Sequence, residues 1–207
     1  MDNWWAPVTL RARHVRLEPL SEEHVDDLFD GCADADVWRW MPVAAPSTVD
    51  DMRVVVGDAL RESTARARIP FAIIEQSTGR AIGSTSYLDV VPAHRRIEIG
   101  WTWLGKPWWR TAANTEAKLL LLGHAFDTLQ ARRVALKTDV RNDRSQAAIG
   151  RLGAQREGVL RSHIERPDGS RRDTVYFSIL SDEWPGVRER LEARVQRHAG
   201  TAAYLRW

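Results

Sequence analysis

The stretch Trp108-Trp109-Arg110-Thr111-Ala112-Ala113-Asn114-Thr115-Glu116-Ala117-Lys118 decides the fold of this 207-residue chain. It follows a strand-like segment, Arg96 to Leu104, and opens an apolar helix-like segment that reaches Leu129. A short loop of small residues that leads into a helix leaves the first backbone N–H groups without partners in the helix. These groups lie at the positive end of the helix dipole. The junction therefore suits a pyrophosphate and predicts an anionic cofactor.

The composition is typical of a single globular domain, with 43% hydrophobic and 28% charged residues. We expect one domain over residues 1–197 and a loose tail over residues 198–207. The formal net charge is only +2, and acidic residues nearly match basic ones, which argues against nucleic acid as a partner. Apolar runs stay far below the roughly 20 residues that span a bilayer, so no membrane partner is expected. Together these features predict a cytoplasmic protein.

Hydrophobic periodicity and turn residues predict strands and helices in an order typical of an α+β fold, with helices on both faces of a sheet. The clearest helix boundary is Asp143, which suits an N-cap, followed ten residues later by Gly153, which suits a C′ position. The expected strands are 9–19, 71–75, 81–90, 96–104, 133–140, 158–165 and 172–180. The expected helices are 22–29, 34–41, 48–65, 115–129, 143–152 and 183–196.

A series of segments, spread over about half of the chain, resembles the GNAT superfamily of acyl-CoA N-acyltransferases. The closer resemblance is to its branch of ribosomal-protein N-acetyltransferases (RimJ/RimL-like). It implies a single GNAT-like domain with a mixed, mostly antiparallel sheet of about seven strands. The segments that carry the resemblance are Glu98–Leu104, Asn114–Leu122, His124–Phe126, Arg133–Asp139, Asn142–Ser145, Gly153-Ala154, Arg156–Arg161, Pro167–Gly169 and Glu183–Pro185.

The phosphate loop departs from the family pattern. The superfamily form is Gln/Arg-x-x-Gly-x-Gly/Ala, whereas this chain has Trp109 to Asn114, with Ala112 and Asn114 at the glycine positions. Alanine disfavours positive φ, so we expect helix-compatible or extended dihedrals and a compensating phosphate contact from Arg110. The resemblance implies acetyl-CoA as co-substrate, bound by Trp103, Leu104, Trp109, Arg110, Thr111, Ala112, Ala113, Asn114, Thr115, Asn142 and Ser145.

In this superfamily an amine attacks the thioester directly, without a covalent enzyme intermediate. The resemblance places backbone N–H donors for the carbonyl oxygen near Trp103 and Leu104. Glu98 is the expected base because it points away from Ile97 and Ile99, which suit the core. The alternative for Glu98 is a salt bridge to a neighbouring arginine, Arg95 or Arg96, on a solvated face.

The leaving thiolate needs a proton or a hydrogen bond. The resemblance points to Ser145 as a catalytic donor and to Asn142 as a contact for the pantetheine arm, although both residues equally suit helix capping. Many relatives use a tyrosine for this step, and none is placed here. The expected substrate-binding residues are Trp38, Trp40, Met41 and Trp101, with the core as the alternative for the first three.

These residues together predict an N-acetyltransferase that moves an acetyl group from acetyl-CoA to a primary amine. The acceptor is a peptide N-terminus or another amine-bearing small molecule, and dimerisation, common in this branch, implies a homodimer. No metal is expected, because the histidines are scattered and Cys32 is the one cysteine. A catalytically silent acyl-CoA sensor or scaffold remains the alternative, given the missing glycines and tyrosine.

Overall fold

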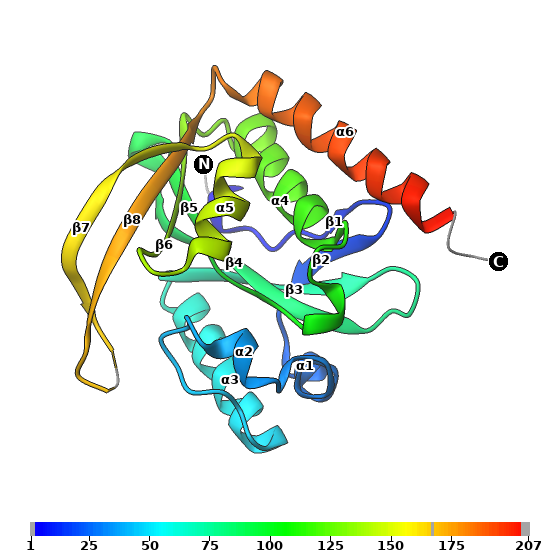
Figure 1. Ribbon diagram of the computed structural model, residues 1–207, viewed down its shortest axis with the longest axis vertical. Coiled ribbons are helices and arrows are strands. Elements are labelled where there is room, and N and C mark those ends of the chain that lie inside the picture. Colours follow the sequence, from blue (N-terminus) through cyan, green and yellow to red (C-terminus); the bar gives the residue numbers. More distant parts are fainter. Residues whose placement is uncertain (1–2, 167, 204–207) are drawn as a thin grey trace.

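The computed structural model describes residues 3–166 and 168–203 and shows a sheet between two layers of helices (Figure 1). The strands are β1 (Leu10–Arg11), β2 (Val15–Pro19), β3 (Arg68–Glu75), β4 (Ala81–Val91), β5 (Arg96–Leu104), β6 (Arg133–Asp139), β7 (Gln155–Glu165) and β8 (Arg171–Leu180). The helices are α1 (Val25–Cys32), α2 (Ala35–Trp38), α3 (Val49–Thr64), α4 (Ala113–Gly123), α5 (Asp143–Leu152) and α6 (Trp184–Ala203). The expected α+β architecture with helices on both faces is confirmed.

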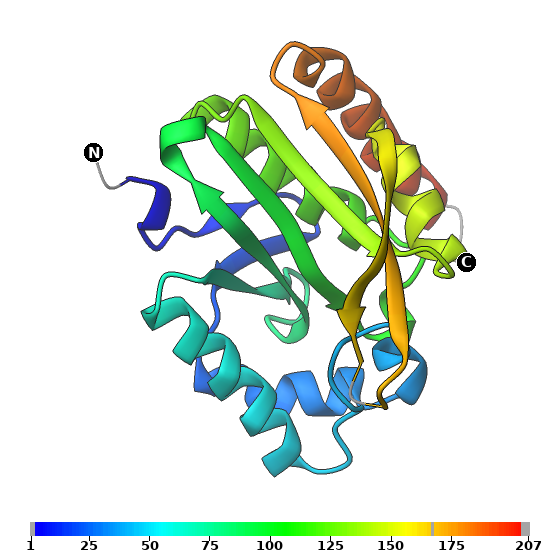
Figure 2. The ribbon, with the colours of Figure 1, turned by 90° about the vertical axis from the view of Figure 1, so that its left-hand side faces the viewer.

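The sheet has eight strands in the order β1-β2-β3-β4-β5-β6-β8-β7. Every neighbouring pair is antiparallel except β5 and β6, which are parallel. The sheet is therefore mixed and mostly antiparallel, as the resemblance implied. Its far edge is the long β7–β8 hairpin, which extends beyond the other strands (Figure 2).

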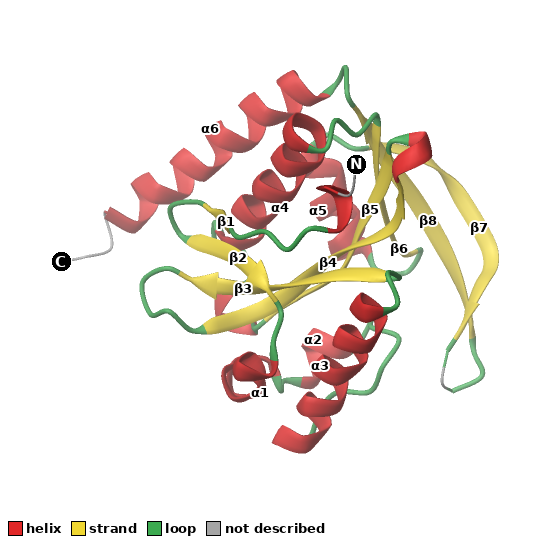
Figure 3. Ribbon diagram, turned by 180° about the vertical axis from the view of Figure 1, so that it is seen from behind, coloured by secondary structure: helices red, strands yellow, loops and turns green. Residues whose placement is uncertain are grey.

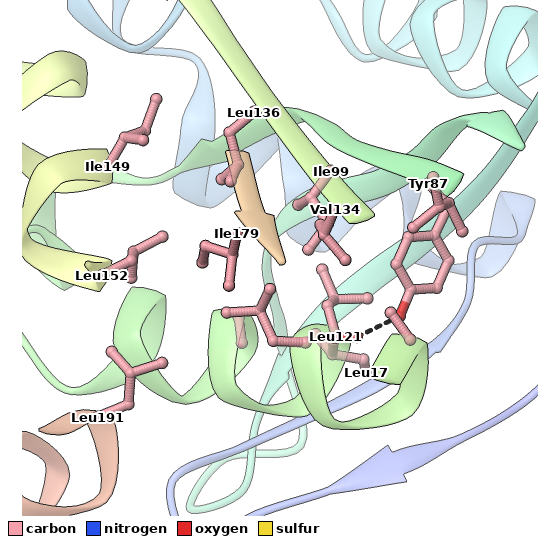
Figure 4. Close-up of a cluster of buried hydrophobic side chains, with 14 of the residues drawn as sticks. Leu17, Tyr87, Ile99, Leu121, Val134, Leu136, Ile149, Leu152, Ile179 and Leu191 are labelled. Carbon is pink, nitrogen blue, oxygen red and sulfur yellow. Dashed lines mark hydrogen bonds between the residues drawn. The ribbon is translucent and has the colours of Figure 1, made fainter. Parts of the chain in front are cut away.

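Two separate hydrophobic cores lie on the two faces of this sheet, and Figure 3 shows the helices that cover them. The larger core joins the sheet to α4, α5 and α6; in it the Tyr87 hydroxyl donates to the Leu121 carbonyl (Figure 4). The smaller core joins the other face to α1, α2 and α3. Ile97 and Ile99 belong to the larger core, so the alternate side chains of β5 face the α1–α3 layer.

Local capping explains most of the helix starts. Thr48 and Asp51 form a reciprocal capping box that begins α3, and Ser21 caps the turn before α1. The N-cap of α5 is Asn142 rather than the expected Asp143, because the Asn142 side chain accepts the Ser145 N–H at 3.0 Å. Gly153 ends this helix with a φ of 96°, a left-handed conformation that glycine adopts without strain.

Two expectations for the ends of the chain need correction. The segment 9–19 is not one strand but an antiparallel hairpin, in which Leu10 pairs with Leu17. At the other end, α6 continues to Ala203, so the part of the expected tail from 198 to 203 is helical. The remaining tail residues, 204–207, lie outside the described residues, as does Pro167, between the last two expected strands.

Candidate active site

The parallel strands β5 and β6 separate soon after they begin to pair. Their ladder ends where Glu98 lies opposite Ala135, so the second half of β5 has no partner on that side. On its other side β5 pairs with β4, and a bulge places Trp101 and Thr102 opposite Thr85. Trp101 has a φ of 47°, consistent with a bulged residue. This separation leaves backbone groups of β5, up to Trp103 and Leu104, along an open sheet edge.

The N-terminus of α4 begins close after this edge. Glu116 is the first residue of α4 whose N–H donates back to a preceding carbonyl, that of Ala112, at 2.9 Å. The Ala113 N–H donates to the Thr111 hydroxyl at 3.2 Å. In the described part of the chain no acceptor is recorded for the N–H groups of Asn114 and Thr115. Two of the backbone donors that the sequence predicted are therefore free for an anion.

The conformation of the phosphate loop agrees only partly with the expectation. Ala112, at the first glycine position, has the helical dihedrals φ −67° and ψ −21°, as expected for alanine. Arg110 instead has a φ of 64°, so the expectation that the loop avoids left-handed dihedrals is wrong at this residue. The left-handed residue of this loop is therefore Arg110, two residues before Ala112, which occupies the first glycine position of the family pattern. The Arg110 side chain is exposed.

Trp109 connects the phosphate loop to both sides of the separation between the strands. Its indole N–H donates to the Leu104 carbonyl at 2.7 Å, which fixes the loop to the end of β5. The guanidinium of Arg144, in the first turn of α5, lies 3.8 Å from the centroid of the Trp109 ring. This stacking brings the starts of α4 and α5 together across the open edge.

At the start of α5, Asn142 and Ser145 have different hydrogen-bonding states. Asn142 is 8% exposed, and its side-chain oxygen is used by the N-cap, so only its NH2 group remains for a ligand. The Ser145 hydroxyl is partly exposed, and no hydrogen bond to it is recorded among the described residues. Capping therefore accounts for Asn142 but not for the Ser145 side chain.

Glu98 is buried on the face of β5 that looks toward α1–α3. It is 3% exposed, and its Oε2 lies 3.0 Å from the Lys137 Nζ of β6. Its Oε1 is buried with no hydrogen-bond partner. Burial raises the pKa of Glu98, and the Lys137 cation opposes this shift. The alternative of a solvated salt bridge to Arg95 or Arg96 is wrong, because the carboxylate is buried and its ion-pair partner comes from another strand.

The four expected substrate-binding residues lie in two environments. Trp38 is 2% exposed in the smaller core, where its ring packs at a tilt against that of Trp103, with centroids 4.8 Å apart, and its indole N–H donates to the Cys32 carbonyl. Its burial favours the core alternative. Trp40, Met41 and Trp101 are only partly buried. The guanidinium groups of Arg39 and Arg141 lie 5.4 and 5.5 Å from the centroid of the Trp40 ring. The Arg68 guanidinium lies 4.4 Å from the centroid of the Trp101 ring.

Four buried side-chain atoms lack a hydrogen-bond partner in the described part of the chain, and all four lie on this same face of the sheet. They are Glu98 Oε1 and Trp103 Nε1 of β5, and Arg172 Nε and Thr174 Oγ1 of β8. Arg172 and Thr174 were not among the residues expected from the sequence. The signal was present, because polar residues at 172, 174, 176 and 178 alternate with Val175, Phe177 and Ile179 of the larger core.

The opposite face of β5 holds another buried cation that the sequence did not reveal. Lys118 of α4 is 6% exposed, and its Nζ lies 2.6 Å from the Thr102 hydroxyl and 3.4 Å from the Thr85 hydroxyl. Burial lowers the pKa of Lys118 to about 7. The lysine therefore holds the bulge of β5 from the side of α4.

Two negative findings apply to the described residues alone. Across 3–166 and 168–203, no group of three or more His, Cys, Asp or Glu side chains is arranged to hold a metal ion. Over the same ranges, none of the helices has the length and apolar character needed to cross a membrane.

Comparison with known proteins agrees with this geometry. Residues 14–155 match the family model described as Acetyltransferase (GNAT) domain. "Putative ribosomal N-acetyltransferase YdaF" of Bacillus subtilis is 30% identical over 174 residues, which cover 83% of this chain and 92% of that protein.

Solved structures show the same fold. A putative acetyltransferase from T. thermophilus has a TM-score of 0.83 and 43% identity, and the match covers 92% of this chain and 98% of that one. Mycobacterium smegmatis RimJ in complex with CoA-disulfide has a TM-score of 0.73 and 23% identity, and the match covers 91% and 93%. The chain belongs to the GNAT superfamily of acetyltransferases, in its RimJ/RimL-like branch.

Proposed function

We propose that this acetyltransferase transfers an acetyl group from acetyl-CoA to a primary amine, by direct attack of the amine and without a covalent enzyme intermediate. The observation that carries the proposal is the end of β5–β6 pairing at Glu98 and Ala135. Beyond this point β5 has an open edge, and the buried carboxylate of Glu98 lies where that edge begins. Holding an amine and a thioester together at such an edge supplies several kcal/mol of the barrier reduction.

The residues present fit coenzyme A. The free N–H groups of Asn114 and Thr115 would hold the pyrophosphate, next to the small buried side chains of Ala112 and Ala113. The open edge of β5 would pair with the amides of the pantetheine arm, as in β-augmentation. The RimJ neighbour is described in complex with a CoA disulfide, which supports this assignment. When bound, acetyl-CoA supplies the activated acetyl group.

Glu98 would accept the proton of the attacking amine. Its Oε1 has no partner, so it can accept a hydrogen bond without breaking one. Its raised pKa brings the carboxylate closer to the range in which proton transfer is efficient near neutral pH. Backbone N–H groups at the end of β5, near Trp103 and Leu104, would stabilise charge on the carbonyl oxygen.

Ser145 would donate a hydrogen bond to the departing sulfur, and the NH2 group of Asn142 would contact the pantetheine arm. The unassigned hydroxyl of Ser145 at the start of α5 supports this role. Trp40, Met41 and Trp101 would line the acceptor side. The acceptor would be a peptide N-terminus or a small-molecule amine, and the ribosomal function in the name of the YdaF relative favours the peptide.

Calorimetry with coenzyme A and thiol release from acetyl-CoA with a panel of amines test the proposal together. We expect heat of binding with coenzyme A and amine-dependent thiol release. Absence of both would refute the proposal. Binding without release for any amine would instead support the silent acyl-CoA sensor, which the alanine-containing phosphate loop favours.

A further inference from the structure

The buried polar atoms without partners do not all belong to the proposed chemistry. Glu98 Oε1 is accounted for by the attacking amine, but Arg172 Nε and Thr174 Oγ1 belong to β8, two strands away from β5. Leaving such atoms buried and unpaired lowers stability, because each has lost its hydrogen bonds to water without gaining another. A ligand that supplies acceptors to them would recover this stability.

Arg172 differs from the basic side chains around it because each of them is in an ion pair with a carboxylate. Lys137 pairs with Glu98 at 3.0 Å, and Arg68 pairs with Glu62 at 3.3 Å. A third carboxylate, the buried Asp139, pairs with both Arg141 and Arg166.

No hydrogen bond or ion pair of the Arg172 side chain is recorded within residues 3–166 and 168–203, although the residue is partly buried. It is close enough to Arg166 and Glu98 for their charges to act on it, and the Arg166 cation opposes the charge of Arg172 whereas the Glu98 carboxylate favours it. Arg172 is therefore a partly desolvated cation that has no counter-ion among the described residues.

The charges nearby favour a carboxylate over a phosphate. With Glu98 ionised, the group of Glu98, Lys137 and Arg172 carries a net charge of +1, from two cations and one anion. The nearby Arg166 cation does not change this sum, because Asp139 balances its charge. One carboxylate balances this charge, whereas a phosphate dianion would leave an excess of negative charge next to Glu98. The buried Nε of Arg172 and a second guanidinium N–H form the planar pair of donors that matches a carboxylate.

The position of Arg172 along the sheet limits where this carboxylate lies in the acceptor. Glu98 lies opposite Ala135 of β6, which lies opposite Ser178 of β8, and Arg172 is on the same face six residues away along β8. At about 3.3 Å per residue this is roughly 20 Å of strand, which the lengths of the arginine and glutamate side chains reduce. The carboxylate is therefore separated from the reacting amine by several bonds.

We propose that the acceptor is an amine that carries a carboxylate several bonds from its nitrogen, and that Arg172, assisted by the Thr174 hydroxyl, binds this carboxylate. Two sources share this chemistry. One is a small ω-amino acid, and the other is a peptide N-terminus with an acidic residue near its start. The inference rests on the proposed function and narrows its acceptor.

The test compares matched acceptors in the intact protein. The first arm uses ω-amino acids of three to six carbons against their amides, and the second uses short peptides with Glu or Gln at the second or third residue. We expect kcat/KM for the carboxylate member to exceed that of its neutral partner by about tenfold or more, as for one charge-assisted hydrogen bond. The arm that shows the ratio identifies the source.

Arg172→Met should bring the ratio close to one, and Arg172→Lys should retain part of it. The matched control is Arg171→Met, which removes the same charge from an exposed position on the same strand and should keep the full ratio. Thermal melts show whether each variant is folded. Equal rates for both members of every pair, or a ratio that survives Arg172→Met, would overturn the inference.

A second readout keeps this test separate from the proposed function. Each member of a pair is titrated by calorimetry into the complex of the protein with coenzyme A. Tighter binding of the carboxylate member, lost in Arg172→Met, supports the inference even if no thiol is released. Equal binding of both members overturns it. Absence of thiol release with every amine refutes the proposed function instead.

Discussion

Each face of the sheet holds one buried glutamate and one lysine, but the two glutamates differ in their hydrogen-bonding partners. On the α4 side, Glu116 is 1% exposed and accepts from the backbone N–H groups of His14 and Val15, at 2.7 and 3.0 Å, and lies 2.7 Å from the His14 ring nitrogen. On the α1–α3 side, Glu98 is 3% exposed and has only Lys137, with one oxygen left unpaired.

From this difference we infer a structural role for Glu116 and a chemical role for Glu98. A buried carboxylate whose acceptors are all used holds the fold, here by fixing the β1–β2 hairpin to α4. A buried carboxylate with an unpaired oxygen lowers the stability of the free protein. We expect such a feature where a ligand or a proton supplies the missing hydrogen bond during function. The four partnerless atoms of the described chain share the face of Glu98, which supports our proposal that the chemistry takes place on that face.

Glu98→Gln should produce the largest effect, because it removes the proposed base while preserving its shape. We expect kcat/KM to fall by about 10²–10⁴-fold, the usual contribution of general acid–base catalysis. The wild-type rate should rise with pH through the raised pKa of Glu98, whereas the variant should show no such rise. Steady-state kinetics between pH 5 and pH 9 measure both. Exposed Glu165 provides the control Glu165→Gln, and an unchanged pH profile in Glu98→Gln would remove the role of Glu98.

Glu116→Ala should act on stability instead. The substitution leaves the His14 and Val15 N–H groups without their acceptor, at a cost of about 1–3 kcal/mol for each buried group. We expect the free energy of unfolding to fall by roughly 3 kcal/mol in urea denaturation. Glu192→Ala, on the exposed surface of α6, should change it by less than about 0.5 kcal/mol. Equal losses in these two variants would show that Glu116 does not anchor the hairpin.

The sequence predicted elements whose signals are local. The bounds of β5 were predicted to the residue, and α3 was predicted to within one residue at each end. The β1–β2 hairpin was predicted as one strand, because its turn contains neither glycine nor proline and is held by Glu116, about a hundred residues away in the sequence. No pattern near residue 14 carries that information. Similarly, the cap of α5 shifted by one residue because Asn142 and Asp143 both suit an N-cap.

The candidate site could be predicted where one strand or one helix start defines it. The orientation of Glu98 followed from alternation in β5, and the free N–H groups at the start of α4 followed from the loop that precedes it. The partners of these groups come from other strands. Lys137 reaches Glu98 only because β6 pairs with β5 in one register, and Arg172 joins them through β8. Register between distant strands is not encoded in any short segment.

Lys118→Met tests the cation on the α4 face. The folded-state pKa of Lys118 is lowered from 10.5 to about 7, so between these values the unfolded chain binds one more proton than the folded one. The wild-type free energy of unfolding should therefore rise with pH above about 7, by up to about 1.4 kcal/mol per pH unit. Lys118→Met should lose this rise, because methionine does not titrate.

Urea denaturation at pH 7, 8 and 9 measures this difference. Lys106→Met is the control, because Lys106 is exposed and its ion pairs with Asp34 and Asp36 raise its pKa, so it does not titrate in this range. It should keep the slope of the wild type. A wild-type slope that persists in Lys118→Met would assign the pH dependence to another group.

Lys137→Met should have the smallest effect of the four variants. It also distinguishes the two faces of β5 most directly. Loss of the Lys137 cation removes the main influence that lowers the pKa of Glu98, whose burial then acts with less opposition. The rise of kcat/KM with pH should move to higher pH by about one unit, the lower end of the shift caused by an adjacent opposite charge. Kinetics across pH 5 to pH 10 locate this rise.

The same substitution in a Glu98→Gln background should produce no shift, because the titrating group is gone. Lys118→Met, on the other face, should leave the position of the rise in place, since its ammonium contacts hydroxyl groups rather than Glu98. If both lysine variants moved the rise equally, the reactive and architectural faces of β5 would not be electrostatically separate.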